Sequence, residues 1–104
     1  MKRFILSEDA DNDLQEIKRY LLSEGGTPLV RHILARLKSA MFMLALNPYL
    51  GHVREDLTKE PVRFWGVFSY LIVYDPLMKP LGVARILQGN QDLARIFLKS
   101  PPRF

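Results

Sequence analysis

The sequence contains no cysteine among its 104 residues, and this absence excludes several kinds of site. There is no disulfide framework, no thiolate metal site and no cysteine nucleophile, and we expect a cytoplasmic protein. No run of 18 or more apolar residues occurs, so we expect no membrane contact. The apolar stretch before the first acidic residue is too short for a secretory signal. Repeats and low-complexity tracts are also missing.

The composition that remains is that of an ordinary globular protein. Hydrophobic residues make up 48% and charged residues 25% of the chain, whose length suits one domain over residues 1–104. The formal net charge is +4, which suits an acidic partner, either nucleic acid or an acidic protein segment. Charge alone is equally consistent with good solubility.

The first half of the sequence predicts a short strand followed by two amphipathic helices. Arg3 to Ser7 forms the strand, and Ser7 can cap the first helix. Gly25 and Gly26 end that helix, a second helix starts at Thr27, and we expect an antiparallel hairpin. The two apolar stripes contain Ala10, Leu14, Ile17, Leu21, Val30, Ile33, Leu34, Leu37, Met41 and Leu44.

The second half is rich in β-branched and aromatic residues. We expect strands at 62–67, 70–74 and 81–87, joined by short connections as an antiparallel meander. Asn90 can cap a short last helix. The fold class is therefore α+β: an N-terminal strand, a two-helix hairpin packed on an antiparallel sheet of three further strands, and a short C-terminal helix.

The sequence contains no pattern that predicts a metal or cofactor site. The two histidines, His32 and His52, have no second ligand at a suitable spacing, so no metal site is expected. No nucleophile elbow, phosphate-binding loop or dinucleotide fingerprint is present, and no cofactor is expected.

Arginines in the strands are the main candidates for partner binding. Arg63 and Arg85 are flanked by apolar neighbours, and Trp65 shares a face with Arg63 because strand side chains alternate. If the helices cover one sheet face, these residues form a cationic patch on the open one. Arginine beside an aromatic ring is common both at protein hot spots and in stacking on bases, so the patch does not choose between the two.

Two apolar residues of the second helix lie off its stripe. Phe42 and Met43 are neighbours of the stripe residues Met41 and Leu44, but they point elsewhere. They are either exposed or covered by another segment, and the outer face of a helical layer is a reasonable place for another chain to dock.

The order of motifs along nearly the whole chain resembles the RelE/ParE superfamily of bacterial type II toxin–antitoxin pairs, and within it the ParE branch. The resemblance rests on these residues: Ser7, Ala10, Asp13, Leu14, Ile17 and Tyr20; Asn47, Pro48 and Gly51; Arg54, Asp56 and Leu57; Val62 to Trp65; Ser69 to Tyr74; Val83, Arg85 to Leu87 and Gly89; and Asp92.

The resemblance implies one of two activities. RelE-type toxins are ribosome-dependent mRNA endoribonucleases that use basic and acid–base side chains, whereas ParE-type toxins inhibit DNA gyrase by binding and are not enzymes. Leu71, Gln91 and Phe97 stand where the ribonucleases carry an arginine, a basic residue and an aromatic acid or base. Gln88 replaces a frequent histidine. These departures favour the gyrase inhibitor, with the ribonuclease as the alternative. A third hypothesis is a non-toxic family member whose only role is to form the complex, and the sequence leaves it open.

The resemblance also implies partners and surfaces. We expect a cognate ParD-like antitoxin, in a heterotetramer or a larger complex, and a role in growth arrest and plasmid stabilisation. We assign target binding to six residues, which are Arg54, Arg63, Trp65, Arg85, Gln88 and Asp92. We assign antitoxin binding to Tyr20, Arg36, Phe42 and Met43. Arg85 and Asp92 could instead pair and tie the strand to the last helix.

Overall fold

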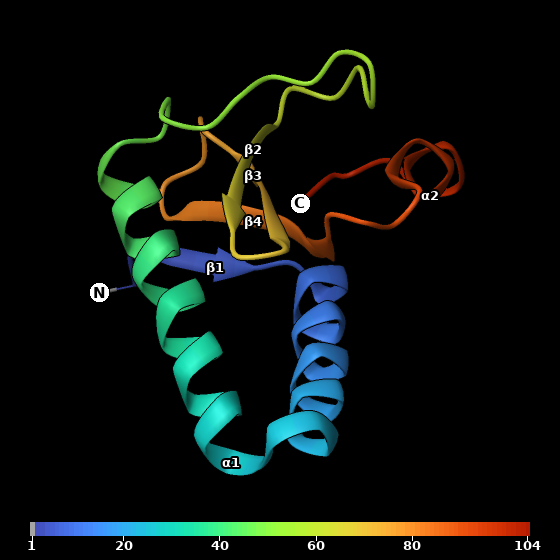
Figure 1. The fold of residues 1–104 in the computed structure, drawn as a ribbon. Coiled ribbons are helices and arrows are strands. Elements are labelled where there is room, and N and C mark those ends of the chain that lie inside the picture. Colours follow the sequence, from blue (N-terminus) through green and yellow to red (C-terminus); the bar gives the residue numbers. More distant parts are fainter. Residues whose placement is uncertain (1) are drawn as a thin grey trace.

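The computed structural model describes residues 2–104, which form a four-stranded sheet with helices on both of its faces (Figure 1). The elements along the chain are β1 (Phe4–Leu6), α1 (Glu8–Leu46), β2 (Arg63–Val67), β3 (Tyr70–Asp75), β4 (Leu81–Gln88) and α2 (Leu93–Lys99). No helix of this part of the chain is both long and apolar enough to cross a lipid bilayer.

The sheet is mixed, with strand order β1-β4-β3-β2. Strands β2, β3 and β4 form the expected antiparallel meander. β1 joins this meander at the edge, parallel to β4, with Phe4 opposite Leu81 and Leu6 opposite Val83. The expected antiparallel sheet of three strands is therefore wrong, because β1 extends it to four strands and adds a parallel pair. The parallel pairing is possible because α1 and two strands separate β1 from β4 along the chain.

The expected two-helix hairpin is replaced by one long helix. α1 runs for 39 residues and bends at Gly26, the one residue inside it with non-helical backbone angles (φ 69, ψ −167). Glycine adopts a positive φ without the steric cost of a side chain, and Pro28 has its φ already set for a helix, so no loop is needed. We call residues 8–25 the N-terminal arm and residues 27–46 the C-terminal arm, which are blue and green in Figure 1.

The apolar stripes of α1 face the sheet, as expected. Seven of the ten stripe residues are buried in the main core: Ala10, Ile17, Leu21, Ile33, Leu37, Met41 and Leu44. A second cluster fills the opposite face of the sheet, where Leu93 and Phe97 of α2 pack with Phe64, Val73 and Leu87. An apolar cluster therefore lies on each face of the sheet. The open face that we expected to carry the cationic patch is not present in the described part of the chain.

The two helix starts are fixed by side chains. The Ser7 hydroxyl accepts a hydrogen bond from the Ala10 N–H (3.0 Å), as expected of a cap, and donates one to the Ala84 carbonyl (2.7 Å). α2 is capped by Asp92, which accepts from the Arg95 N–H (3.2 Å), and the expected cap Asn90 is wrong. Asp92 is the cap because it directly precedes Leu93, the first residue of α2, so its carboxylate can accept from a free N–H of the first turn.

Candidate functional site

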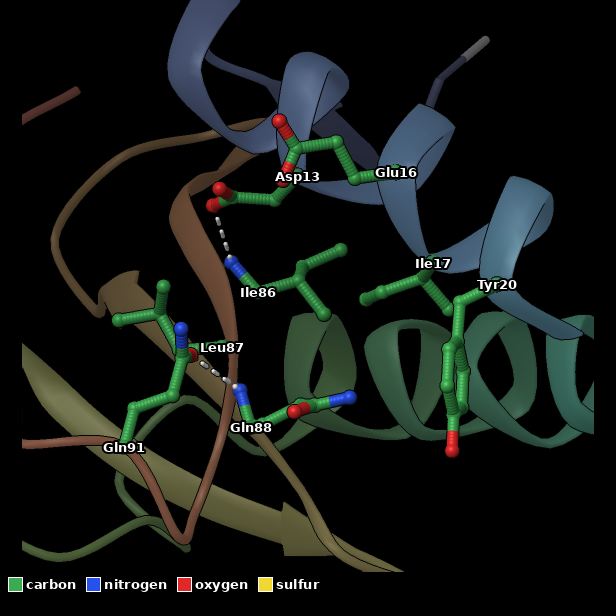
Figure 2. Close-up of a pocket in the computed structure, with 8 residues that line it drawn as sticks. All are labelled: Asp13, Glu16, Ile17, Tyr20, Ile86, Leu87, Gln88 and Gln91. Carbon is green, nitrogen blue, oxygen red and sulfur yellow. Dashed lines mark hydrogen bonds between the residues drawn. The ribbon is translucent and has the colours of Figure 1, made fainter.

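A polar pocket of about 290 Å³ lies where the N-terminal arm of α1 passes the end of β4 (Figure 2). Tyr20 and Glu16 line it from the helix, and Gln88 and Gln91 line it from the strand end. The Gln88 side chain points towards Tyr20, while the Gln88 N–H donates to the Gln91 side-chain oxygen (3.0 Å). The pocket brings together Gln88, assigned to the target, and Tyr20, assigned to the antitoxin. Tyr20 is exposed, and a hydrogen bond with Glu24 raises the pKa of its hydroxyl.

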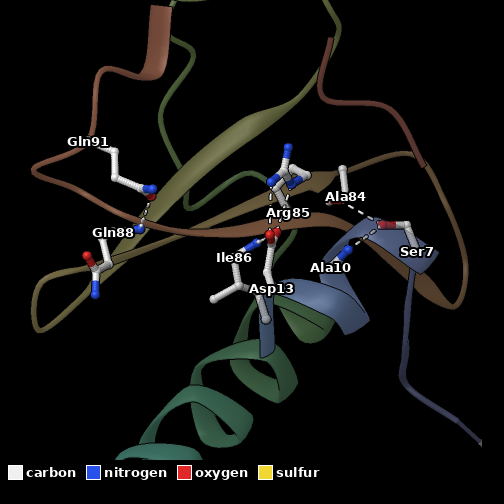
Figure 3. Close-up of polar contacts among 8 residues, drawn as sticks. All are labelled: Ser7, Ala10, Asp13, Ala84, Arg85, Ile86, Gln88 and Gln91. Atoms are coloured by element: carbon white, nitrogen blue, oxygen red, sulfur yellow. Dashed lines mark hydrogen bonds and ion pairs between the residues drawn. The ribbon is translucent and has the colours of Figure 1, made fainter. Parts of the chain in front are cut away.

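Arg85 forms a bidentate ion pair with Asp13, as Figure 3 shows. Its Nε and a terminal nitrogen lie 2.7 and 2.8 Å from the two carboxylate oxygens of Asp13. The same carboxylate accepts a hydrogen bond from the Ile86 N–H (3.0 Å). Ile86 lies beyond Val83, the last residue of β4 that pairs with β1. The hydrogen bonds with Asp13 raise the pKa of Arg85 above its ordinary value. Arg85 therefore clamps α1 to β4, and the expected pairing with Asp92 is wrong.

Strand register also separates the two arginines of the expected patch. Arg63 pairs with Tyr74, whose side chain belongs to the main core beneath α1, whereas Arg85 pairs with Val73, which belongs to the second cluster. Directly opposed residues point to the same face of a sheet, so Arg63 and Arg85 lie on opposite faces. Arg63 does share its face with Trp65, as expected, but this face is the one towards α1.

Arg63 packs against the turn that follows α1. Its guanidinium lies 5.0 Å from the centre of the Tyr49 ring and donates to the Gly51 carbonyl (2.8 Å). The Tyr74 hydroxyl holds the same turn, since it accepts the Gly51 N–H (2.8 Å) and donates to the Pro48 carbonyl (2.6 Å). Burial raises the pKa of Tyr74. Tyr49 is 60% exposed, so a partner can reach the ring next to Arg63.

Trp65, assigned to the target, lies in one groove with two residues assigned to the antitoxin. Arg36 and Met43 of the C-terminal arm line this groove of about 360 Å³ together with Trp65 and Phe68. Phe68 stands at the turn between β2 and β3, and the Arg36 guanidinium lies 5.1 Å from the centre of its ring. Sequence assigned these residues to different partners, but the structure places them side by side.

The remaining assigned residues lie apart from that groove. Phe42 is on the β1 side of the C-terminal arm, where its ring meets Phe4 edge-on at 5.2 Å. Arg54 lies in the loop before β2 and forms an exposed ion pair with Asp56 (2.8 Å), whose pKa it lowers through their hydrogen bonds. Asp92 caps α2. Nothing in this geometry brings all six target residues, or all four antitoxin residues, onto one surface.

Comparison with known proteins identifies the family. Residues 4–93 match the family described as the ParE toxin of type II toxin-antitoxin system, parDE. The chain belongs to the ParE toxin family. This membership implies an antitoxin partner. No curated protein matches the sequence with significance.

Within the ParE family, the three residues that depart from the ribonuclease pattern have structural roles here. Phe97 is buried, with its ring 5.9 Å from that of Phe64, and Leu71 packs against the same cluster. The Gln91 side chain accepts the N–H of Gln88. Among residues 2–104, no group of three or more histidine, aspartate or glutamate side chains is placed to hold a metal ion.

Sequence reasoning missed three residues of the ParE chain that matter for these sites, namely Asp13, Tyr49 and Phe68. Asp13 gave a usable signal, because it follows Ala10 by three residues and precedes Ile17 by four. That spacing puts a carboxylate on the apolar face of the helix, where an acidic side chain needs a partner. Tyr49 and Phe68 gave no signal, since each depends on contacts with a distant element.

Proposed function

We propose that this ParE-family chain is the toxin of its pair and inhibits DNA gyrase by binding, so that growth stops until the antitoxin neutralises it. The family match over residues 4–93 carries this proposal. The toxin would trap the state of gyrase in which the DNA is cleaved, without doing chemistry of its own.

The side chains at the three positions that differ from the ribonuclease pattern support binding over catalysis. General acid–base work needs groups that exchange protons near neutral pH. Leu71, Gln91 and Phe97 have no such group, and each is occupied with packing or with a hydrogen bond to the backbone. A ribosome-dependent ribonuclease would have to use other residues.

The exposed ring of Tyr49, with the half-buried Arg63 side chain beside it, is the best candidate for contact with gyrase. Arg63 is held in place by the Gly51 carbonyl and stacks on the Tyr49 ring, which fixes the charge beside an exposed aromatic surface. Fixed arginine and tyrosine side chains are the residue types that dominate binding energy at interfaces. Arg54, Gln88 and Asp92 are secondary candidates, whereas Arg85 serves as the clamp to Asp13.

A plasmid supercoiling assay with purified gyrase, run beside an in vitro translation assay, tests the proposal. We expect the toxin to block supercoiling and to leave mRNA intact. Cleaved mRNA with unaffected gyrase would instead identify a ribonuclease of the RelE type.

Replacing Arg63 with alanine should weaken the inhibition of supercoiling about tenfold, which corresponds to roughly 1.4 kcal/mol of binding free energy. The physical reason is the loss of a fixed cation beside Tyr49. Arg31→Ala is the matched control, because Arg31 is exposed on α1, and it should inhibit like the unaltered toxin. Melting temperatures distinguish a binding role from a structural one. A drop of more than about 10 °C for Arg63→Ala would assign its effect to the turn that it holds.

A further inference from the structure

The outer edge of β1 has no neighbouring strand in the described part of the chain. β1 stands at the end of the strand order, where it pairs with β4 (Figure 1). The Arg3 carbonyl and the Ser7 N–H are both bonded to β4, at 3.0 and 2.9 Å. Because the hydrogen bonds of a strand alternate between its two sides, Phe4 and Leu6 point their N–H and C=O groups away from β4. The open edge of β1 is therefore ready to pair with another strand.

Exposed aromatic rings flank this edge on both faces of the sheet. On the face towards α1, the Phe42 ring meets Phe4 edge-on and is 41% exposed. On the other face lies Phe104, which is 46% exposed, and a Cβ built on Gly82 would come within 3.0 Å of its ring. Phe42 and Phe104 both line a groove of about 790 Å³ along β1. A strand added to β1 would be covered by an aromatic ring on each face.

The charge of this groove changes sign from one end of β1 to the other. The exposed residues Lys2 and Arg3 precede the strand, whereas the exposed residues Glu8 and Asp11 follow it, and all four line the groove. If a second copy of the chain is turned end to end, its acidic end meets the basic end of the first copy. The groove is thus complementary in charge to itself, as a twofold interface requires.

We propose that two copies of the chain pair antiparallel through β1, about a twofold axis at Ile5, so that their sheets join into one. This register places Phe4 of each copy opposite Leu6 of the other. Both residues point their backbone groups outwards, so every outward N–H of the two strands finds a carbonyl. A register with Phe4 opposite Phe4 would leave the groups of Leu6 without a strand partner. The same axis brings Lys2 of one copy next to Glu8 of the other.

A second copy is the occupant because two independent requirements select the same register. One is the pairing of the outward backbone groups, and the other is the meeting of opposite charges. A strand of three residues makes a small interface, so we expect a weak dimer with a dissociation constant on the order of 10 µM.

The dimer would leave the opposite edge strand of each sheet, β2 with Arg63, uncovered. Each dimer then presents the Arg63 surface twice. The inference does not depend on what that surface binds.

Sedimentation velocity of the purified toxin tests the dimer directly. We expect the sedimentation coefficient to rise from that of a monomer to that of a dimer as the concentration increases from tenfold below to tenfold above the expected dissociation constant. A toxin that remains monomeric throughout this range would overturn the proposal.

Two charge reversals test the register. Lys2→Glu makes both ends of the β1 groove more acidic, and Glu8→Lys makes both ends more basic, so each variant should dimerise at least tenfold more weakly. When the two variants are mixed, each altered end meets an opposite charge, and a heterodimer should form within threefold of the unaltered affinity. The control Lys99→Glu, which makes the same charge change on α2, should dimerise normally. Failure of the mixture to associate would contradict the register.

Amide hydrogen exchange followed by NMR locates the contact without any substitution. The Ile5 N–H faces β4 and should be protected at every toxin concentration. The amides of Phe4 and Leu6 should exchange rapidly in dilute toxin and slow at least tenfold where the dimer forms. A dimer in which these two amides stay unprotected, or protection that requires added antitoxin, would overturn the proposal. Gyrase takes no part in these measurements, so their failure would leave the proposed function untouched.

Discussion

Replacing Asp13 with alanine should lower the free energy of unfolding by about 3 kcal/mol, because the Arg85 charge and the Ile86 N–H would both lose their shared partner. The side chains of Asp13 and Arg85 are only 11% and 16% exposed, so water screens their ion pair weakly. Without the carboxylate, the Arg85 guanidinium loses two short hydrogen bonds and the Ile86 N–H loses its acceptor. Urea unfolding followed by circular dichroism measures the change.

A double-mutant cycle checks that the effect belongs to the clamp. Asp13→Ala and Arg85→Ala should each destabilise the fold, and the pair together should cost less than the sum, with a coupling of at least about 1 kcal/mol. Glu24→Ala is the matched control, since Glu24 is an exposed carboxylate on the same arm, and its cost should stay within about 0.5 kcal/mol. Additive costs for Asp13 and Arg85 would show that the two side chains act independently.

Replacing Tyr74 with phenylalanine should cost about 2 kcal/mol of stability, because the ring stays while both partners of its hydroxyl lose a hydrogen bond. Those partners are the Gly51 N–H and the Pro48 carbonyl, which anchor the turn after α1 to the sheet. Gly51→Ala should also be destabilising, but through a steric clash, since a Cβ there would lie 2.9 Å from the Phe64 carbonyl oxygen and closer still to the Tyr74 hydroxyl. Thermal unfolding of both variants at neutral pH provides the measurement.

The Tyr74 hydroxyl also predicts an alkaline limit to stability. Its pKa in the folded protein is raised above the ordinary value of 10.0, mainly by burial. The folded state therefore holds this proton more tightly than the unfolded state, and the contribution of the hydroxyl is complete below pH 10 and declines as the pH rises further. Unfolding titrations from pH 8 to 11 should show a loss of stability that is smaller in Tyr74→Phe. An equal loss in both proteins would assign the alkaline limit to other groups.

Features that depend on neighbouring residues could be predicted from the sequence. The apolar stripe from Ala10 to Leu44 was correct because helical spacing alone decides which side chains share a face. Ser7 as a helix cap and the meander of β2 to β4 follow from equally local patterns. The bend at Gly26 was placed correctly, but the sequence did not show that a single glycine would suffice and leave no loop.

Features that depend on register and on distant contacts could not be predicted. Arg63 and Arg85 fall on opposite faces because β3 presents Tyr74 to one and Val73 to the other, next to an irregularity between these two residues. Asp13 and Arg85 are 72 residues apart, and no local pattern pairs them. Asp92 was a plausible partner for Arg85 because the two are close in sequence. Its carboxylate instead caps α2 by accepting a hydrogen bond from the Arg95 N–H.

The two candidate surfaces lie in different parts of the fold. The groove with Trp65, Met43 and Arg36 lies between α1 and β2, whereas Arg63 and Tyr49 lie at the turn where α1 ends. Because the resemblance assigns Arg36 and Met43 to the antitoxin, we expect substitutions of these two residues to affect neutralisation first and substitutions at Arg63 to affect toxicity first. Separate effects of this kind would be absent if a single surface met both partners.

The most direct test of the central claim measures cleaved DNA in a reaction of plasmid, purified gyrase and toxin, stopped with detergent and protease. A gyrase inhibitor of the proposed kind should increase linear plasmid in proportion to the toxin added, and an equimolar amount of antitoxin should abolish the increase. Unchanged linear DNA at toxin concentrations that stop growth would contradict the claim.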